Sequence, residues 1–345
     1  MLTALVGSLP QPQGLTLPRF VPKSADPTAA YSHWLREADV DAQYRLIDEH
    51  IAAVVARQAA AGIDVVTDGE LRREHFVYYL YRGIDGIDFD ARQQLSIPRY
   101  GDRQRAVPVI VETPEGIADN LLRDYRVARA AHEGRVKISL PGPFTTTWFI
   151  ADARGRGREE TARSLAAVVR ANAAALAAAG CRDIQIDEPM FAKAPEMACD
   201  VGIPLLDEIF AGLPGDVVRW VHVCCGYPKA VDEDDPAKAP PGCYERLADA
   251  LAGSAADVIS LEDAHRRNDL DLLTRFGTKS VMLGVVDIGR THLESVDALK
   301  ERIAAAVDTI GADRLIVGSD CGMTLLPETV AWAKIEAMVA AVRAL

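Results

Sequence analysis

The sequence lacks the features that mark membrane-spanning, secreted and nucleic-acid-binding proteins. No apolar run reaches the roughly 18 residues that a membrane helix needs. The first residues have neither a basic region nor the long apolar core of a signal peptide. Basic residues are outnumbered 38 to 50, and the net charge of -12 disfavours a nucleic acid or an anionic membrane as a partner. We therefore expect a cytoplasmic protein that binds small molecules.

Cysteine is present, but the pairs that would build a small metal or redox motif are missing. The chain has six cysteines and no CxxC pair, which excludes zinc ribbons and thioredoxin-like sites. Six thiols without a secretory signal indicate a reducing compartment. Cys181, Cys199 and Cys243 have no ligand-like neighbours, so we interpret them as ordinary thiols.

What the chain does contain is an alternation of short apolar runs with amphipathic segments. Hydrophobic residues make up 49% of the sequence, which is ample for a sizeable core. Eight strands alternating with eight helices predict a closed α/β (β/α)8 barrel, a TIM barrel, over an open sheet. The expected strands are 2–6, 64–67, 136–139, 183–186, 219–223, 257–261, 280–284 and 314–318. The expected helices are 41–61, 117–132, 159–179, 204–212, 243–252, 268–275, 295–310 and 327–343.

Residues 75–115 depart from this alternation, because they are rich in glycine and proline and show no clear helix. We expect a loop or small hairpin there, above the barrel. No linker divides the chain, so we expect residues 1–345 to form one domain.

Distinctive motifs follow the predicted strands, where barrel enzymes carry their chemistry. His222 and Cys224 end one strand, Glu262 ends the next, and Cys321 follows the last. Alternate residues of a strand share a face, so His222 and Cys224 point the same way while Cys225 points away. Imidazole, thiolate and carboxylate are zinc ligands, and we predict a Zn²⁺ site of these four residues. An HxC pair considered alone is more often coincidence.

Two further carboxylates lie at strand ends. Asp187 follows an apolar strand directly, and Glu70 follows Asp68 and Gly69. We predict that both act on the substrate, where they suit an ammonium group. A helix cap at Asp187 and a surface salt bridge at Glu70 remain alternatives. A glycine turn between Val6 and Ser8 offers amides to a carboxylate. Trp148 and Phe149 either form an apolar wall over the site or merely pack.

With these residues the chain resembles the catalytic C-terminal barrel of cobalamin-independent methionine synthase. The likeness runs from Val6-Gly7-Ser8-Leu9-Pro10, through Ile186-Asp187-Glu188-Pro189, to Asp320-Cys321-Gly322. By resemblance, His222, Cys224, Glu262 and Cys321 match the zinc ligands, and Glu70 and Asp187 match the carboxylates that hold the homocysteine ammonium. Val6 and Ser8 match the backbone contacts to the amino acid, and Trp148 lies near the position of a folate-stacking tryptophan.

Two departures from the family bear on the methyl donor. We expect no counterpart here to the second, N-terminal barrel of the full-length folate enzymes. Their strand-7 histidine, thought to protonate the departing folate, is replaced after Asp287-Ile288 by Gly289 and Arg290. The chain looks more like short members that resemble corrinoid-dependent methyltransferases. We therefore expect methylcobalamin or a corrinoid protein as donor in preference to methyltetrahydrofolate, although nearby His292 could replace the missing acid.

Our first interpretation is a zinc-dependent methyltransferase that converts homocysteine, or another small thiol, to its methyl thioether. The nearest alternative is a thiol alkyltransferase of the epoxyalkane:coenzyme M transferase type, against which Glu70 and Asp187 argue. A non-enzymatic metal-binding barrel and a zinc-free decarboxylase of the uroporphyrinogen family are further alternatives. Metal content and thiol alkylation would separate them.

Overall fold

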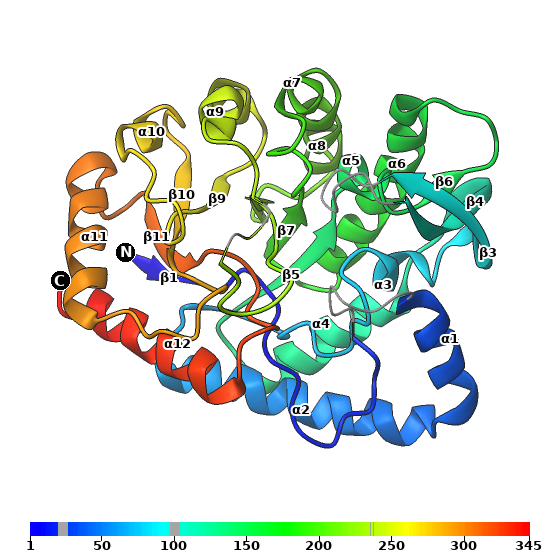
Figure 1. Cartoon of the computed structure of the whole chain (residues 1–345), viewed down its shortest axis with the longest axis horizontal. Helices are drawn as coiled ribbons and strands as arrows, with labels where there is room; N and C mark the ends of the chain where they lie inside the picture. Colours follow the sequence, from blue (N-terminus) through cyan, green and yellow to red (C-terminus); the bar gives the residue numbers. More distant parts are fainter. Residues whose placement is uncertain (20–26, 97–103, 235, 237) are drawn as a thin grey trace.

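The computed structural model describes residues 1–19, 27–96, 104–234, 236 and 238–345. Within these ranges eight parallel strands form one sheet, in the order β1-β11-β10-β9-β8-β7-β5-β2. A bridge between Ala4 and Val65 joins the two ends of that order and closes the sheet into a barrel (Figure 1). The expected (β/α)8 barrel is confirmed. Its strands are β1 (Leu2–Thr3), β2 (Val65–Thr67), β5 (Arg135–Pro141), β7 (Asp183–Asp187), β8 (Val218–Val223), β9 (Val258–Glu262), β10 (Ser280–Val286) and β11 (Leu315–Ser319).

Helices surround the barrel on its outside (Figure 1). The longest, α2, begins after Asp39, whose side chain caps the Ala42 amide, and ends at Gly62 in a left-handed conformation with φ 98°. No described helix is both long and apolar enough to cross a membrane. The main outer helices are α2 (Val40–Ala61), α4 (Asp119–Ala131), α6 (Arg158–Ala178), α8 (Ile203–Phe210), α9 (Cys243–Gly253), α10 (Asp271–Thr274), α11 (Val296–Ile310) and α12 (Glu328–Arg343).

Further helices that the sequence did not indicate lie in the connections. Pro143 and Pro195 each begin one of them, at a position where a helix needs no amide proton. They are α1 (Pro27–Glu37), α3 (Tyr78–Tyr81), α5 (Pro143–Thr146), α7 (Pro195–Met197) and a π-helical turn (Ala198–Gly202) that leads into α8.

The core has two parts, one inside the barrel and one between the barrel and its helices. The large outer cluster joins the strands to helices all around the ring. A smaller cluster fills the barrel, with Trp220 its largest member; the others are Ala4, Val6, Val65, Val258, Met282 and Ile316. The interior is therefore packed with side chains and leaves its open space at the strand ends.

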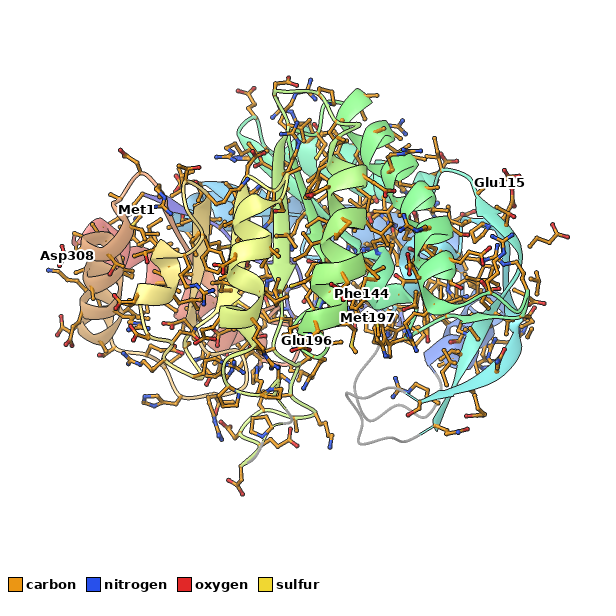
Figure 2. The ribbon with its side chains drawn as sticks, turned by 90° about the horizontal axis from the view of Figure 1, so that it is seen from above. Met1, Glu115, Phe144, Glu196, Met197 and Asp308 are labelled. Carbon is orange, nitrogen blue, oxygen red and sulfur yellow. The ribbon has the colours of Figure 1, made fainter. Side chains whose placement is uncertain are left out.

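The excursion predicted at 75–115 is a hairpin of β3 (Asp85–Ser96) and β4 (Gln104–Glu115). A short parallel strand, β6 (Ala151–Asp152), joins β4 and makes a three-stranded sheet. The hairpin lies at the flank of the barrel, where β4 contacts α6, and not above it as expected. Figure 2 places Glu115 at the far side of the molecule from Met1 and Asp308.

Candidate functional site

A cavity opens where the barrel strands end, and it encloses about 820 Å³, part of it open to solvent. That size is in the usual range for small-molecule sites. Five segments far apart in sequence contribute to it, because parallel strands bring their carboxyl ends to one edge. The lining residues that the sequence predicted are Val6, Ser8, Glu70, Asp187, His222, Cys224 and Cys321.

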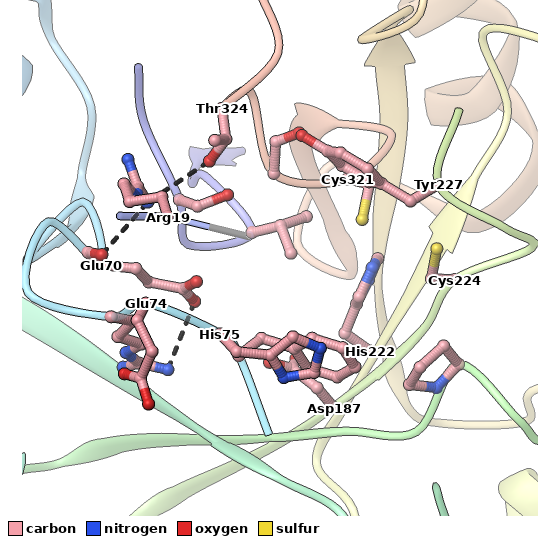
Figure 3. Close-up of a pocket in the computed structure, with 16 residues that line it drawn as sticks. Arg19, Glu70, Glu74, His75, Asp187, His222, Cys224, Tyr227, Cys321 and Thr324 are labelled. Atoms are coloured by element: carbon pink, nitrogen blue, oxygen red, sulfur yellow. Dashed lines mark hydrogen bonds and ion pairs between the residues drawn. The ribbon is translucent and has the colours of Figure 1, made fainter. Parts of the chain in front are cut away.

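Two thiols and an imidazole converge at one end of this cavity (Figure 3). Ligand atoms of His222, Cys224 and Cys321 all lie within 4.8 Å of one another. His222 is 2% exposed, and its Nδ1 lies 2.9 Å from the hydroxyl oxygen of Ser260. Its Nε2 is buried and has no hydrogen-bond partner among the described residues. A buried nitrogen oriented in this way, beside two thiols, fits a zinc ion, which prefers nitrogen and sulfur ligands.

The ionisation of the Cys321 thiol depends on that of Cys224. The pKa of Cys321 is raised well above its usual value, first by its hydrogen bond with Cys224 and then by burial. Two neighbouring thiols, one buried and one half-buried, do not both ionise without a nearby cation, because each thiolate would repel the other. A bound divalent cation would supply that charge, so the donor set fits zinc in its chemistry as well as its placement.

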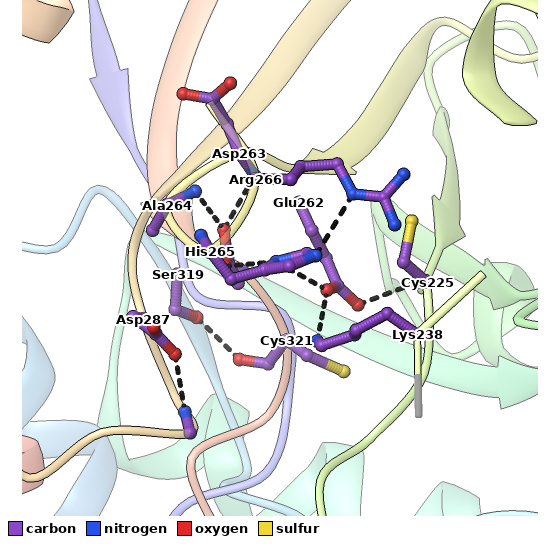
Figure 4. A network of polar contacts seen from close by, with 12 residues as sticks. Cys225, Lys238, Glu262, Asp263, Ala264, His265, Arg266, Asp287, Ser319 and Cys321 are labelled. Carbon is purple, nitrogen blue, oxygen red and sulfur yellow. Dashed lines mark hydrogen bonds and ion pairs between the residues drawn. The ribbon is translucent and has the colours of Figure 1, made fainter. Parts of the chain in front are cut away.

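Glu262, the fourth expected ligand, lies beside this set but is engaged elsewhere (Figure 4). One carboxylate oxygen accepts a hydrogen bond from the Cys225 amide at 2.7 Å, and the other from Lys238 Nζ at 2.7 Å. Its ligand atom groups with His265 and Asp320. Burial, and then the Cys224 charge, raise its pKa well above the usual range, so Glu262 and Cys224 are neighbours. Its role as a zinc ligand stays a prediction.

Asp187 and Glu70 both face the cavity and are 8% exposed. Asp187 pairs in register with His222 on the neighbouring strand, which puts it next to the predicted metal ligands. Burial raises the pKa of its carboxyl to about 6, and the nearby His222 opposes that shift. The predicted substrate contacts and metal ligands therefore meet in one cavity.

The Glu70 side chain is held by an unusual turn. Gly69 and Glu70 both have a positive φ, of 68° and 53°, which is uncommon for a residue with a side chain. The Glu70 carboxylate accepts a hydrogen bond from Ser139 Oγ at 2.7 Å and lies 3.4 Å from Arg73 Nη1. Glu70 is therefore fixed in the cavity wall and does not form the surface salt bridge that the sequence left open.

Trp148 is absent from the described residues that line the cavity. Its ring packs against Phe144, with centroids 4.8 Å apart, and the Arg158 guanidinium lies 3.9 Å above it. The aromatic wall is made instead by Phe76, which lines the cavity and has Phe149 packed edge-on against it at 5.6 Å. A substrate contact by Trp148 stays a prediction without structural support. Phe149, its neighbour in sequence, backs the wall.

The sequence reasoning missed several lining residues, among them Arg19, Arg73, His75 and Tyr227. Arg73 and His75 could have been found, because they continue the loop that begins at Glu70. Arg19 gave no signal, since its place depends on tertiary contacts: its guanidinium donates to the carbonyl oxygens of Leu9 and Glu70 at 2.9 and 3.1 Å.

His292, considered as a replacement acid, lines a second, separate cavity with Arg290 and Glu294. Gly289 and Arg290 line a third cavity that also contains Lys238 and His265. Neither His292 nor Gly289 is among the described residues of the main cavity.

Comparisons with known proteins bear on the family and the fold. A family model described as "Cobalamin-independent synthase, Catalytic domain" matches residues 1–207 and 240–344. A 5-methyltetrahydropteroyltriglutamate–homocysteine methyltransferase of Sodalis glossinidius (strain morsitans) is 30% identical over 296 residues. That alignment covers 83% of this chain and 36% of the relative. The enzyme of the same name from Serratia proteamaculans (strain 568) is 30% identical over 287 residues, covering 80% and 35%. The chain thus spans about a third of these relatives.

Solved structures extend the likeness to the whole chain. A B12-independent methionine synthase from Shewanella sp. W3-18-1, solved in complex with selenomethionine, superposes with a TM-score of 0.85 at 28% identity. The match covers 99% of this chain and 96% of that one. A methyltransferase from Methanosarcina mazei has a TM-score of 0.61 at 14% identity, covering 99% and 94%, and shares the fold.

Proposed function

Because this chain belongs to the family of cobalamin-independent synthase catalytic domains, we propose that it transfers a methyl group to the sulfur of homocysteine and so makes methionine. We treat residues 1–345 as one catalytic barrel. The observation that carries the proposal is the joint placement of a soft metal-ligand set and two carboxylates in one cavity. The relatives named for homocysteine methylation support the choice of acceptor.

The acceptor's amino-acid end would lie between β1, β2 and β7. Asp187 and Glu70 would accept hydrogen bonds from its ammonium group, and charge-assisted bonds of this kind are the stronger ones. The backbone at Val6 and Ser8 would hold its carboxylate, as the family resemblance implies. Arg73, 3% exposed, balances one of the two negative charges, so that the pocket does not hold two carboxylates without a counter-charge.

The acceptor's thiol end would then reach His222, Cys224 and Cys321, which would hold a zinc ion with Glu262 as the candidate fourth ligand. Bound zinc lowers the pKa of a thiol, so that the sulfur is ionised at neutral pH and remains nucleophilic. Ser260 fixes the ring of His222 by its contact with Nδ1. Phe76, backed by Phe149, would make the neighbouring wall apolar and so limit the access of water to the attacking sulfur.

For the donor, the named activity of the two relatives from Sodalis and Serratia favours a methyltetrahydropteroyl compound. None of these comparisons supports the corrinoid donor that we expected from the sequence. A folate nitrogen needs a proton as it departs. We assign that proton to His75, which lines the main cavity. Its Nδ1 accepts the Val77 amide at 3.1 Å, so its proton is carried on Nε2.

The experiment is a methyl-transfer assay on the purified, zinc-loaded protein. Homocysteine is offered with a methyltetrahydropteroyl triglutamate and, separately, with methylcobalamin, and methionine is measured by mass spectrometry. 2-Mercaptoethanesulfonate replaces homocysteine in a parallel reaction, which tests the alkyltransferase alternative. Methionine formed from the pteroyl donor supports the whole proposal. If methionine forms only from methylcobalamin, the acceptor stands and the proposed donor is wrong. If zinc-loaded protein methylates neither thiol, the proposed function is refuted.

A further inference from the structure

One buried amide contacts two of the residues assigned to the acceptor. Gln185 and Asp187 are alternate residues of β7, so both side chains face the barrel interior. Gln185 Nε2 donates to Asp187 Oδ1 at 2.7 Å and to the Val6 carbonyl oxygen at 3.0 Å. Gln185 is fully buried, so no solvent competes for these bonds. Two separate segments of the acceptor site, β1 and β7, are therefore joined through one side chain.

The side-chain amide of a glutamine can adopt two flipped orientations, and the contact with Lys137 sets the orientation of the Gln185 amide. Lys137 Nζ lies 2.6 Å from Gln185 Oε1. In its protonated form the lysine has donors and no acceptor, so it requires the amide oxygen on its side, while the Val6 carbonyl and the Asp187 carboxylate require the amide nitrogen on theirs. The amide nitrogen must then face Val6 and Asp187. In the opposite orientation the amide oxygen would meet a carbonyl and a carboxylate, while the amide nitrogen would meet the lysine.

Lys137 occupies a position that barrels usually give to apolar residues. It is 1% exposed, and its Nζ lies 4.5 Å from the centre of the Trp220 ring. Among the described residues no carboxylate forms a direct ion pair with it. Burial lowers its pKa to about 7, a shift that the charges of Asp187 and Asp183 oppose. A buried lysine without such a pair costs free energy. Its one strong polar contact is with Gln185.

We propose that Lys137 and Gln185 are positioning residues for the amino-acid end of the acceptor. Lys137 fixes the amide of Gln185, and Gln185 fixes the Asp187 carboxylate relative to the Val6 backbone. Because Gln185 binds Oδ1 of Asp187, the other carboxylate oxygen, Oδ2, is left for the substrate ammonium. This inference rests on the proposed function, because it takes Asp187 and Val6 as the residues that hold the acceptor.

The test measures binding of two thiols to the zinc-loaded protein by titration calorimetry. Homocysteine carries the amino-acid end, and 2-mercaptoethanol has the thiol without it. Gln185→Met should weaken homocysteine binding about 10-fold or more, as expected for loss of a hydrogen bond to a charged group. Lys137→Met should weaken it about fivefold, because the amide of Gln185 is then free to turn. Zinc content and 2-mercaptoethanol affinity should not change.

Met282→Leu is the matched control. It alters a fully buried side chain of the barrel-interior cluster on β10, a strand that pairs with β9 and β11 and not with the strands of Lys137 and Gln185. It should bind both thiols as the unaltered protein does. If the methionine variants do not fold, Gln185→Asn and Lys137→Arg keep the polarity but alter the reach, and the same split between the two thiols is expected.

Unchanged homocysteine affinity in the Gln185 and Lys137 variants would overturn the inference. So would equal losses for both thiols, which would indicate general damage to the barrel. Asp187→Asn, measured in the same assay, separates a failure of the positioning role from a failure of the proposed acceptor site. If Asp187→Asn weakens homocysteine binding and the other variants do not, only the positioning role fails. If Asp187→Asn also has no effect, the proposed acceptor site itself fails.

Discussion

A side chain on Gly7 would collide with the carboxylate of Glu70: a Cβ atom there would stand 2.3 Å from Glu70 Oε1. The carboxylate thus occupies the space that any other residue at position 7 would fill. Thr67 ties the same strand ends together, because its hydroxyl donates to the Gly7 carbonyl oxygen at 2.8 Å. The glycine in the first strand-end motif is therefore needed to let a carboxylate from the second strand approach.

We expect Gly7→Ala to move Glu70 out of the acceptor site while leaving the metal ligands in place. Glu70 can move aside only by giving up the contacts of its carboxylate with Ser139 and Arg73. Homocysteine affinity should fall by about 10-fold, the effect of losing one charge-assisted hydrogen bond, with zinc content unchanged. Gly215→Ala is the control, because nothing lies within 4 Å of a Cβ atom there. Equal homocysteine affinity in both variants would show that Glu70 does not hold the acceptor.

Zinc binding should depend on Cys224 and Cys321 and be indifferent to Cys225. Cys224→Ser and Cys321→Ser each remove a sulfur from the converging set, so both proteins should lose most of their zinc on dialysis. Cys225 is fully buried, and its sulfur lies 3.8 Å from that of Cys243, away from the set. Cys225→Ser should keep one zinc per chain. Metal analysis of the three proteins by mass spectrometry is the measurement, and full zinc in either of the first two would refute the assignment.

Much of this could be read from the sequence, for a physical reason. Parallel strands end at one edge of a barrel, so motifs that follow apolar runs must meet, however far apart they are in the chain. His222, Cys224, Cys321, Glu70 and Asp187 were found in this way, and all five line one cavity. The alternation of apolar runs and amphipathic segments likewise predicted the eight barrel strands and their outer helices.

The sequence could not supply what depends on side-chain direction or on the path of loops. Trp148 and Phe149 are adjacent, and only the turn after α5 decides that Phe149 lies behind the wall while Trp148 packs on Phe144. The hairpin was expected from its glycines and prolines, but its place at the flank follows from packing against α6. The contact between Lys238 and Glu262 joins a loop to a strand end, which no local pattern records.

That contact leads to a prediction about metal affinity. Lys238 lies in residues 208–239, which the family model does not match, and its ammonium occupies one oxygen of Glu262. Lys238→Met should tighten zinc binding about 10-fold, because it frees the carboxylate and removes a positive charge that repels the ion. Lys238→Arg keeps the charge and should change little. Competition with a chromophoric chelator measures both proteins.

Glu262→Gln completes this test. If Glu262 is a ligand, the variant should bind zinc more weakly than the unaltered protein, and adding Lys238→Met to it should bring no tightening beyond the loss of charge. A Lys238→Met protein that binds zinc more weakly than normal would mean that the lysine supports the site, and the competition argument would then be wrong.

The last prediction concerns the proton for the departing donor, which Gly289 cannot supply from a side chain. His75 is the imidazole other than His222 among the described residues that line the main cavity, and its Nδ1 is committed to the Val77 amide. His75→Gln keeps an amide donor in that place but cannot release a proton at neutral pH. General acid catalysis contributes about 10²- to 10⁴-fold, so methionine formation from a methyltetrahydropteroyl donor should slow by about 100-fold or more, with homocysteine affinity and zinc content unchanged. Transfer from methylcobalamin should not slow, because the departing cobalt(I) species needs no proton.

Phe76→Leu is the matched control for damage to the cavity wall and should affect transfer from both donors alike. If His75→Gln turns over the pteroyl donor at the normal rate, the acid lies elsewhere; if the unaltered protein uses only methylcobalamin, the absence of an acid at Gly289 was the better guide to its donor.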